Sequence, residues 1–144
     1  MSVQLKINQI TQQHSCLQSI FESLIQSKNR TGITKNQFKI LQVIQEIIDD
    51  NQECAMQTIA TKLNSSLPAL TQSINRMTSL KLVIRQNSSA DRRKIILEIT
   101  SLGTAKLQDY LIVKQEISTQ IFGVLSKLEL DIMIDLYQKL TLNK

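Results

Sequence analysis

The stretch SSADRRKIILEITSLG, residues 88–103, decides the fold of this chain. Its polar start carries the charged run Asp91-Arg92-Arg93, and residues 95–99 have the β-branched, aliphatic composition of a strand. Another strand-like run, Leu82-Val83-Ile84, lies upstream, and residues 86–94 between the two runs are polar and basic. Two such runs around a polar segment predict a β-hairpin with a long, positively charged tip.

Two short helices are predicted immediately before this hairpin. Residues 55–63 have the apolar spacing of a helix, and the polar turn 64–66 follows them. Ser66 can cap a second helix, whose first turn tolerates Pro68 because the amide there has no helical partner. The outward and flanking positions of this second helix are Pro68, Ala69, Thr71, Gln72, Asn75, Arg76 and Ser79. This pattern predicts a helix-turn-helix, which places its second helix in the major groove of DNA, and the hairpin that follows is then a wing.

Longer amphipathic helices are predicted on both sides of this centre. Residues 8–28 have helical apolar spacing, and residues 34–37 match the capping box that starts another helix. After the hairpin, Thr100 or Ser101 can cap a further helix, and a second capping box at 126–129 opens the last one. With 3 glycines, 1 proline and 3% aromatic residues, the composition suits a helical chain with an aliphatic core. The expected fold class is mainly α with a small β-hairpin wing, a winged helix-turn-helix with long terminal helices.

Size and composition set further bounds. The chain has 144 residues, of which 42% are hydrophobic and 20% charged, and this suits a single packed domain. It has no apolar run of 18 residues and no secretion-signal pattern at its N-terminus, which favours the cytoplasm and no membrane partner. Two cysteines, Cys16 and Cys54, are too few for a disulfide framework, so reduced thiols are expected.

Positive charge is concentrated in the middle of the chain. Residues 54–97 hold seven basic residues and one acidic residue, a net charge of +6, while the whole chain carries +5. A clustered positive field is typical of proteins that bind polyanions such as DNA. The alternative is a solvated surface with a chance excess of basic side chains.

The sequence offers little for catalysis. It has one histidine, and it has no nucleophile motif, no phosphate-binding glycine loop and no paired carboxylates in a plausible cleft. No cluster of Cys, His and carboxylate residues has metal-ligand spacing, so neither a metal nor another cofactor is expected. We therefore predict a binding protein and not an enzyme.

These features together resemble the MarR family of bacterial transcription regulators over nearly the whole chain. The most specific similarity is Asp91-Arg92-Arg93 followed by residues 97–103, which looks like that family's wing signature: Asp-x-Arg, a strand, and a Leu-x-Leu-Thr-x-x-Gly-like ending. Residues 74–77 with 82–85 are similar to the exit of the family's recognition helix into its first wing strand. Residues 33–41 resemble the start of its second helix.

Two positions depart from the family pattern. Lys81 stands where the family usually has glycine, and a left-handed backbone there would cost lysine about 1 kcal/mol more than glycine. Gln72 stands where a basic residue is often found, although a glutamine amide can pair with N6 and N7 of adenine together.

The resemblance implies a homodimer whose terminal helices interlock. Its two recognition helices would enter successive major grooves of a pseudo-palindromic operator, about 34–36 Å apart. The implied role is a repressor that a small-molecule or redox signal releases from double-stranded DNA. The expected organisation is a single domain, 1–144, with dimerisation helices in 1–32 and 101–144 and a DNA-binding lobe at 33–100. The alternative is a helical protein-interaction module, or anti-activator, whose degenerate winged helix does not bind DNA.

Candidate DNA contacts come from the wing and the second helix of the helix-turn-helix. Of Arg92 and Arg93, one guanidinium would enter the minor groove and the other would pair with Asp91, the wing brace. The Asp-x-Arg pattern favours Arg93 as the partner of Asp91. Lys62 and Arg85 are expected to contact phosphate. Further candidates, each of which could instead be plain solvated surface, are Ser66, Pro68, Ala69, Thr71, Gln72, Asn75 and Arg76.

Two residues of the first predicted helix are candidates for redox or effector sensing. Some members of the resembled family sense oxidants through a cysteine there, but the tyrosines that usually surround it are missing near Cys16. A small, half-buried thiol is the alternative interpretation of Cys16. His14 could bind a metal or sense pH, whereas a place in the core or the dimer interface is the simpler interpretation.

Overall fold

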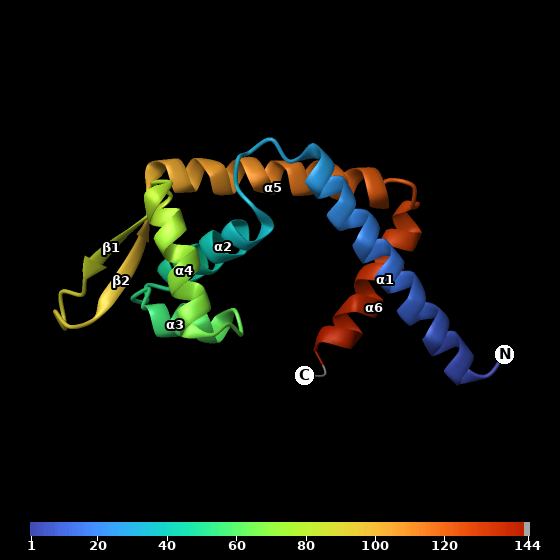
Figure 1. The fold of residues 1–144 in the computed structure, drawn as a ribbon. Coiled ribbons are helices and arrows are strands. Elements are labelled where there is room, and N and C mark those ends of the chain that lie inside the picture. The colour runs from blue at the N-terminus through green and yellow to red at the C-terminus, as the bar shows by residue number, and fades with distance from the viewer. Residues whose placement is uncertain (143–144) are drawn as a thin grey trace. The chain divides into compact units, whose positions relative to one another are not determined.

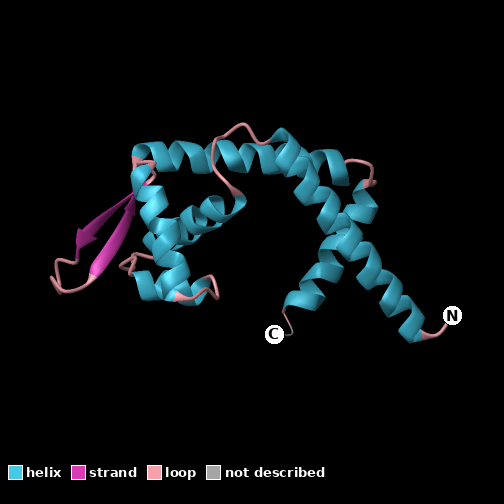
Figure 2. Ribbon diagram, in the orientation of Figure 1, coloured by secondary structure: helices cyan, strands magenta, loops and turns pink. Residues whose placement is uncertain are grey.

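The computed structural model describes residues 1–142, which form helices and one β-hairpin (Figures 1 and 2). In chain order the elements are α1 (Val3–Lys28), α2 (Lys35–Asp49), α3 (Met56–Lys62), α4 (Leu67–Ser79), β1 (Val83–Asn87), β2 (Ile95–Ile99), α5 (Ser101–Phe122) and α6 (Lys127–Thr141). The predicted fold class, mainly helical with a small hairpin wing, is confirmed. Every helix within these described residues is too short or too polar to span a lipid bilayer.

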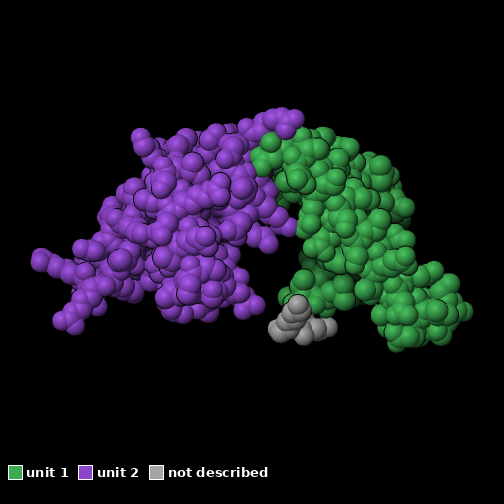
Figure 3. Space-filling model, in the orientation of Figure 1, with its two compact units in different colours: residues 1–29, 112–144 green, residues 30–111 purple. Residues whose placement is uncertain are grey.

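The chain divides into two compact units, which Figure 3 colours separately. One comprises residues 30–111, with the helix-turn-helix, the hairpin and the first half of α5. The other comprises residues 1–29 and 112–144, with α1, the rest of α5 and α6.

The unit of residues 30–111 has a well-packed apolar core. Helices α2, α3 and α4 pack together and against the hairpin. The phenyl ring of Phe38 on α2 stacks on the ring of Tyr110 on α5, with centroids 4.2 Å apart. The core side chains of the helices and the hairpin include Phe38, Ile40, Leu41, Ile44, Ile47, Ile59, Leu70, Ile74, Met77, Leu82, Val83, Leu97 and Leu107. This core holds the helix-turn-helix and the base of the wing in place.

The hairpin is anchored to the core at one end only. Its strands are antiparallel, with Val83 opposite Ile99 at the base and Asn87 opposite Ile95 near the tip. The segment before α3 extends the sheet for a short distance, because the amide of Leu97 donates to the carbonyl oxygen of Cys54 at 2.9 Å. Val83 and Leu97 are the buried residues of the two strands, so apolar packing ends close to the base.

Helix starts follow the local signals in the sequence. The predicted capping boxes at Thr34 with Gln37 and at Ser126 with Glu129 are both present. Ser66 caps α4 by accepting a hydrogen bond from the amide of Ala69 at 3.3 Å. One predicted boundary is wrong: α1 begins at Val3 and not at residue 8, because Ser2 caps the helix by accepting a hydrogen bond from the amide of Leu5.

Three helices end in a residue with a left-handed backbone. Asn51 after α2, Asn64 after α3 and Lys81 after α4 have φ of 56°, 50° and 59°. Asparagine tolerates this conformation, but lysine does not do so readily. Lys81 is nevertheless held there, because its amide bonds to Thr78 and the amide of Leu82 bonds to the carbonyl of Met77, in the pattern of a Schellman motif.

Replacing Lys81 with glycine is expected to stabilise the protein. Glycine adopts the left-handed conformation without the steric cost of a Cβ, so Lys81→Gly should raise the free energy of unfolding by about 1 kcal/mol. Lys81→Ala is the matched control, because it removes the same charged side chain and keeps the Cβ. Urea unfolding at one protein concentration measures both variants, and a glycine variant no more stable than the alanine variant would contradict the expectation.

The first turn of α5 lies directly against the end of α4. The hydroxyl of Thr100 donates to the carbonyl of Lys81 at 2.6 Å and accepts from the amide of Gly103 at 3.0 Å. Of the two candidate caps, Thr100 is thus the one that starts this helix. A Cβ on Gly103 would overlap the carbonyl oxygen of Leu82 and lie 2.8 Å from a methyl of Ile99. Glycine is needed at this position because two backbones approach each other closely.

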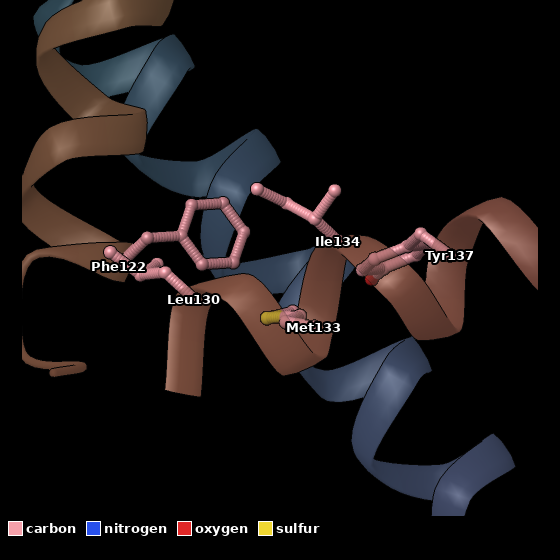
Figure 4. A pocket seen from close by; sticks show the side chains of 5 residues that line it. All are labelled: Phe122, Leu130, Met133, Ile134 and Tyr137. Carbon is pink, nitrogen blue, oxygen red and sulfur yellow. The ribbon is translucent and has the colours of Figure 1, made fainter. Parts of the chain in front are cut away.

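The other unit leaves most of its apolar side chains uncovered. Neither α1 nor α6 has a buried residue, although Ile117 of α5 is buried. Side chains at the end of α5 and along α6 line a pocket of about 260 Å³ (Figure 4). They are Phe122, Leu130, Met133, Ile134 and Tyr137. The apolar faces of the terminal helices are therefore only partly covered in the single chain.

Candidate nucleic-acid interface

Helix α4 has one apolar face and one polar, exposed face. Leu70, Ile74 and Met77 anchor it in the core. The predicted contacts that lie exposed on this helix are Pro68, Ala69, Gln72, Asn75 and Arg76, while Thr71 is half-buried. The spacing of the anchors by three and four residues is what turns these side chains to the outside.

The polar side chains of this segment differ in how many hydrogen-bond donors and acceptors they have free for a ligand. Gln72 and Arg76 make no side-chain hydrogen bond to other described residues, so all their donors and the Gln72 acceptor face solvent. The hydroxyl of Thr71 donates to the carbonyl of Leu67 at 2.8 Å, and the hydroxyl of Ser66 is the helix cap. Gln72 and Arg76 are therefore the side chains best prepared to bind an external group.

Asn75 connects the second helix to the wing. Its Oδ1 accepts a hydrogen bond from Nη2 of Arg85, on β1, at 2.7 Å. This bond fixes the direction of the Arg85 guanidinium and uses the amide oxygen of Asn75, whose Nδ2 remains a donor. Both residues were predicted to contact DNA, but the sequence did not indicate that they bind each other.

The tip of the wing presents two arginines. Arg92 and Arg93 are exposed, and neither guanidinium has a hydrogen bond or ion pair with the described residues. Asp91 Oδ1 accepts a hydrogen bond from the backbone amide of Arg93 at 3.0 Å, and not from a guanidinium as the sequence pattern predicted. The short side chain of Asp91 reaches the amide two residues on without any long side chain having to be ordered, as in an Asx-turn.

A second carboxylate, outside the predicted set, also contacts the wing. Oε1 of Glu53, in the loop between α2 and α3, accepts from the hydroxyl of Ser88 at 2.5 Å. Its Oε2 pairs with Nζ of Lys94 at 3.4 Å. The hydrogen bond from Ser88 lowers the pKa of Glu53 below its usual value, with a smaller contribution from Lys94. No sequence signal identifies this contact, because 35 residues separate Glu53 from Ser88.

The candidate sensing residues lie elsewhere. His14 and Cys16 are both exposed on α1. Cys54 is buried before α3, and burial raises the pKa of its thiol to about 11. That thiol is therefore protonated and unreactive at neutral pH. Within residues 1–142, no group of three or more Cys, His, Asp or Glu side chains is placed to hold a metal ion.

Comparison with solved structures shows the same fold in several regulators. YusO from Bacillus subtilis is 20% identical, with a TM-score of 0.79 and 100% of both chains covered. A MarR mutant from E. coli, complexed with operator DNA, is 21% identical with a TM-score of 0.73, and the match covers 98% of this chain and 99% of that one. A mutant of S. aureus MepR is 19% identical with a TM-score of 0.74 and full coverage of both chains. No curated protein matches the sequence.

A family model covers the centre of the chain. The model for the transcriptional regulators SarA and Rot matches residues 22–110, which include the helix-turn-helix, the wing and the first half of α5. This match extends over more than half of the sequence, and the structural neighbours agree with it in fold. The chain belongs to the SarA/Rot family of transcriptional regulators and has the winged-helix fold of the MarR proteins.

Proposed function

We propose that this transcriptional regulator is a homodimeric repressor that binds a pseudo-palindromic operator through α4 and the wing. The observation that carries the proposal is the bond between Asn75 on α4 and Arg85 on β1, at 2.7 Å. It joins a helix with an exposed polar face to a wing with two arginines that have no partner among the described residues, in the segment that holds a net charge of +6. The MarR mutant complexed with operator DNA has the same fold, which supports this assignment.

The proposed role of each residue follows from the hydrogen-bonding groups that its side chain has free. Gln72 and Arg76 would read base edges in the major groove, where a glutamine amide suits adenine and a guanidinium suits guanine. Arg85, held by Asn75, would contact a phosphate and set the position of the helix. Arg92 and Arg93 would contact the DNA backbone and the minor groove. Asp91, which accepts a hydrogen bond from the amide of Arg93, would hold the turn at residues 91–93.

The proposal assigns dimerisation to the terminal helices. Large exposed apolar patches on a protein mark interaction surfaces, and a symmetric pairing of two chains would cover them. We place the dimerisation helices in 1–32 and 101–144, the DNA-binding lobe in 33–100, and the whole protein in the cytoplasm. The apolar residues left exposed on the terminal helices include Val3, Leu5, Ile7, Ile10, Ile20, Ile112, Leu128, Ile132, Ile134, Leu136 and Leu140.

Titration with random double-stranded DNA at two salt concentrations tests the proposal. The affinity should fall steeply with salt, by about 0.9 log units per log unit of salt for each phosphate contacted. An operator should bind more tightly than random DNA under the same conditions. An absence of binding at low salt would overturn the proposal and favour a protein-interaction module with a degenerate winged helix.

A further inference from the structure

The wing tip has little apolar support. From Ile84 to Ile96 the only buried residue is the polar Ser88, and its exposed fraction is 1%. A hollow of about 530 Å³ lies beside this part of the wing, with Glu53, Cys54, Ser89 and Ile96 among its lining residues. Packing therefore does not fix the tip, and polar contacts must do so if the arginines are to be held in one place.

Ser88 uses its whole hydrogen-bonding capacity at the tip. A hydroxyl offers one donor and two acceptor positions. Its proton goes to Oε1 of Glu53 at 2.5 Å, and its oxygen accepts from the amides of Ala90 and Asp91 at 3.2 and 3.4 Å. A hydroxyl bonded to a carboxylate at this distance is among the stronger hydrogen bonds in proteins. Burial makes the bond more important, because an unpaired buried hydroxyl is costly.

Lys94 provides the second contact between Glu53 and the loop. Its Nζ pairs with Oε2 of Glu53 at 3.4 Å, and its carbonyl accepts from the amide of Ser88 at 2.9 Å. Its own amide donates to the carbonyl of Asp91, also at 2.9 Å. One carboxylate from the α2–α3 loop thus contacts both ends of the segment 88–94, which carries Arg92 and Arg93 between them.

We propose that Glu53 is a positioning residue for DNA binding, which clamps the wing tip through Ser88 and Lys94 and so holds Arg92 and Arg93 ready for the duplex. The proposal rests on the proposed function, since the clamp matters only if the wing contacts DNA. Ordering the loop before DNA arrives reduces the conformational entropy that binding would otherwise cost. A negative residue thereby favours the binding of a polyanion.

The direction in which DNA affinity changes when Glu53 is replaced tests the proposal. If Glu53 acted on DNA only through its charge, removing that charge would strengthen DNA binding. Loss of the clamp predicts the opposite for Glu53→Ala, a loss of operator affinity on the order of tenfold, with faster hydrogen exchange at the amides of residues 88–94. Glu53→Gln keeps an acceptor for the hydroxyl of Ser88 but loses the ion pair with Lys94, so exchange should be slower, and operator binding tighter, than in Glu53→Ala.

Glu46→Ala is the matched control. Glu46 is an exposed glutamate of α2 whose side chain has no hydrogen bond or ion pair with the described residues, so its removal should leave exchange in the wing unchanged. The proposal is overturned if exchange at 88–94 is the same in Glu53→Ala as in the native protein, or if the alanine and glutamine variants bind operator equally well. If the native protein does not bind DNA at all, the proposed function fails, whereas the exchange measurement on the free protein still decides whether the clamp exists.

Discussion

Replacing Arg92 and Arg93 together with alanine is expected to weaken DNA binding on the order of a hundredfold. A hydrogen bond to a charged group contributes about 1.5 kcal/mol or more, so removing two such bonds amounts to about 3 kcal/mol. Both guanidinium groups are exposed and unpaired in the described part of the chain, so neither makes a structural interaction that folding requires. Affinity for operator and for random DNA should both fall, because the contacts proposed for the wing are with phosphates and with the potential of the minor groove.

Salt dependence and single variants show what each arginine does. The slope of log affinity against log salt should become shallower by about 0.9 for each phosphate that the variant no longer neutralises. Arg92→Ala and Arg93→Ala should differ from each other if one arginine enters the minor groove and the other does not. Lys39→Ala, at an exposed position of α2, is the control for removal of a positive charge. Unchanged affinity in the double variant, with the native sedimentation behaviour retained, would show that the wing assignment is wrong.

Replacing Gly103 with alanine is expected to destabilise the protein by about 3 kcal/mol, at the upper end of the range for overpacked sites. The new methyl would overlap the carbonyl oxygen of Leu82, which is backbone and also accepts from the amide of Thr100 at 3.1 Å. Relief would require the first turn of α5 to move away from the end of α4. Helix propensity alone predicts the opposite sign, because alanine in a helix is favoured over glycine by about 1 kcal/mol.

Urea unfolding at a fixed protein concentration separates overpacking from helix propensity, and the fixed concentration is needed because the stability of the proposed dimer would depend on it. Thr104→Ala is the control, an exposed position one residue further along α5 where the change should stay within about 0.5 kcal/mol. A Gly103→Ala protein as stable as the native one would mean that the two backbones are further apart than the structure places them.

Features that depend on neighbouring residues were predictable from the sequence. The capping boxes at 34–37 and 126–129 formed where they were predicted, because each joins groups three residues apart. The outward positions predicted for α4 likewise indicated which of its faces is exposed. The start of α1 was predicted too late, since the cap at Ser2 was not recognised.

Interactions between distant residues could not be predicted. Asp91 and the two arginines were recognised as a wing, but the partner of the Asp91 carboxylate is a backbone amide, which a pattern of side chains does not indicate. Ser88 lies in the segment predicted to be a polar hairpin tip, yet it is buried against Glu53. The DNA contacts assigned to α4 and the wing remain predictions.

By itself, the sequence determined the order and type of the elements, the polar face of α4 and the basic wing tip, because periodicity, capping and charge are local properties of a chain. The tertiary structure alone decided why Gly103 must be glycine, how Asn75 orients Arg85, and that Glu53 contacts Ser88 in the wing. These depend on which backbones and side chains folding brings within about 3 Å of each other, the reach of a hydrogen bond, and sequence separation does not encode that distance.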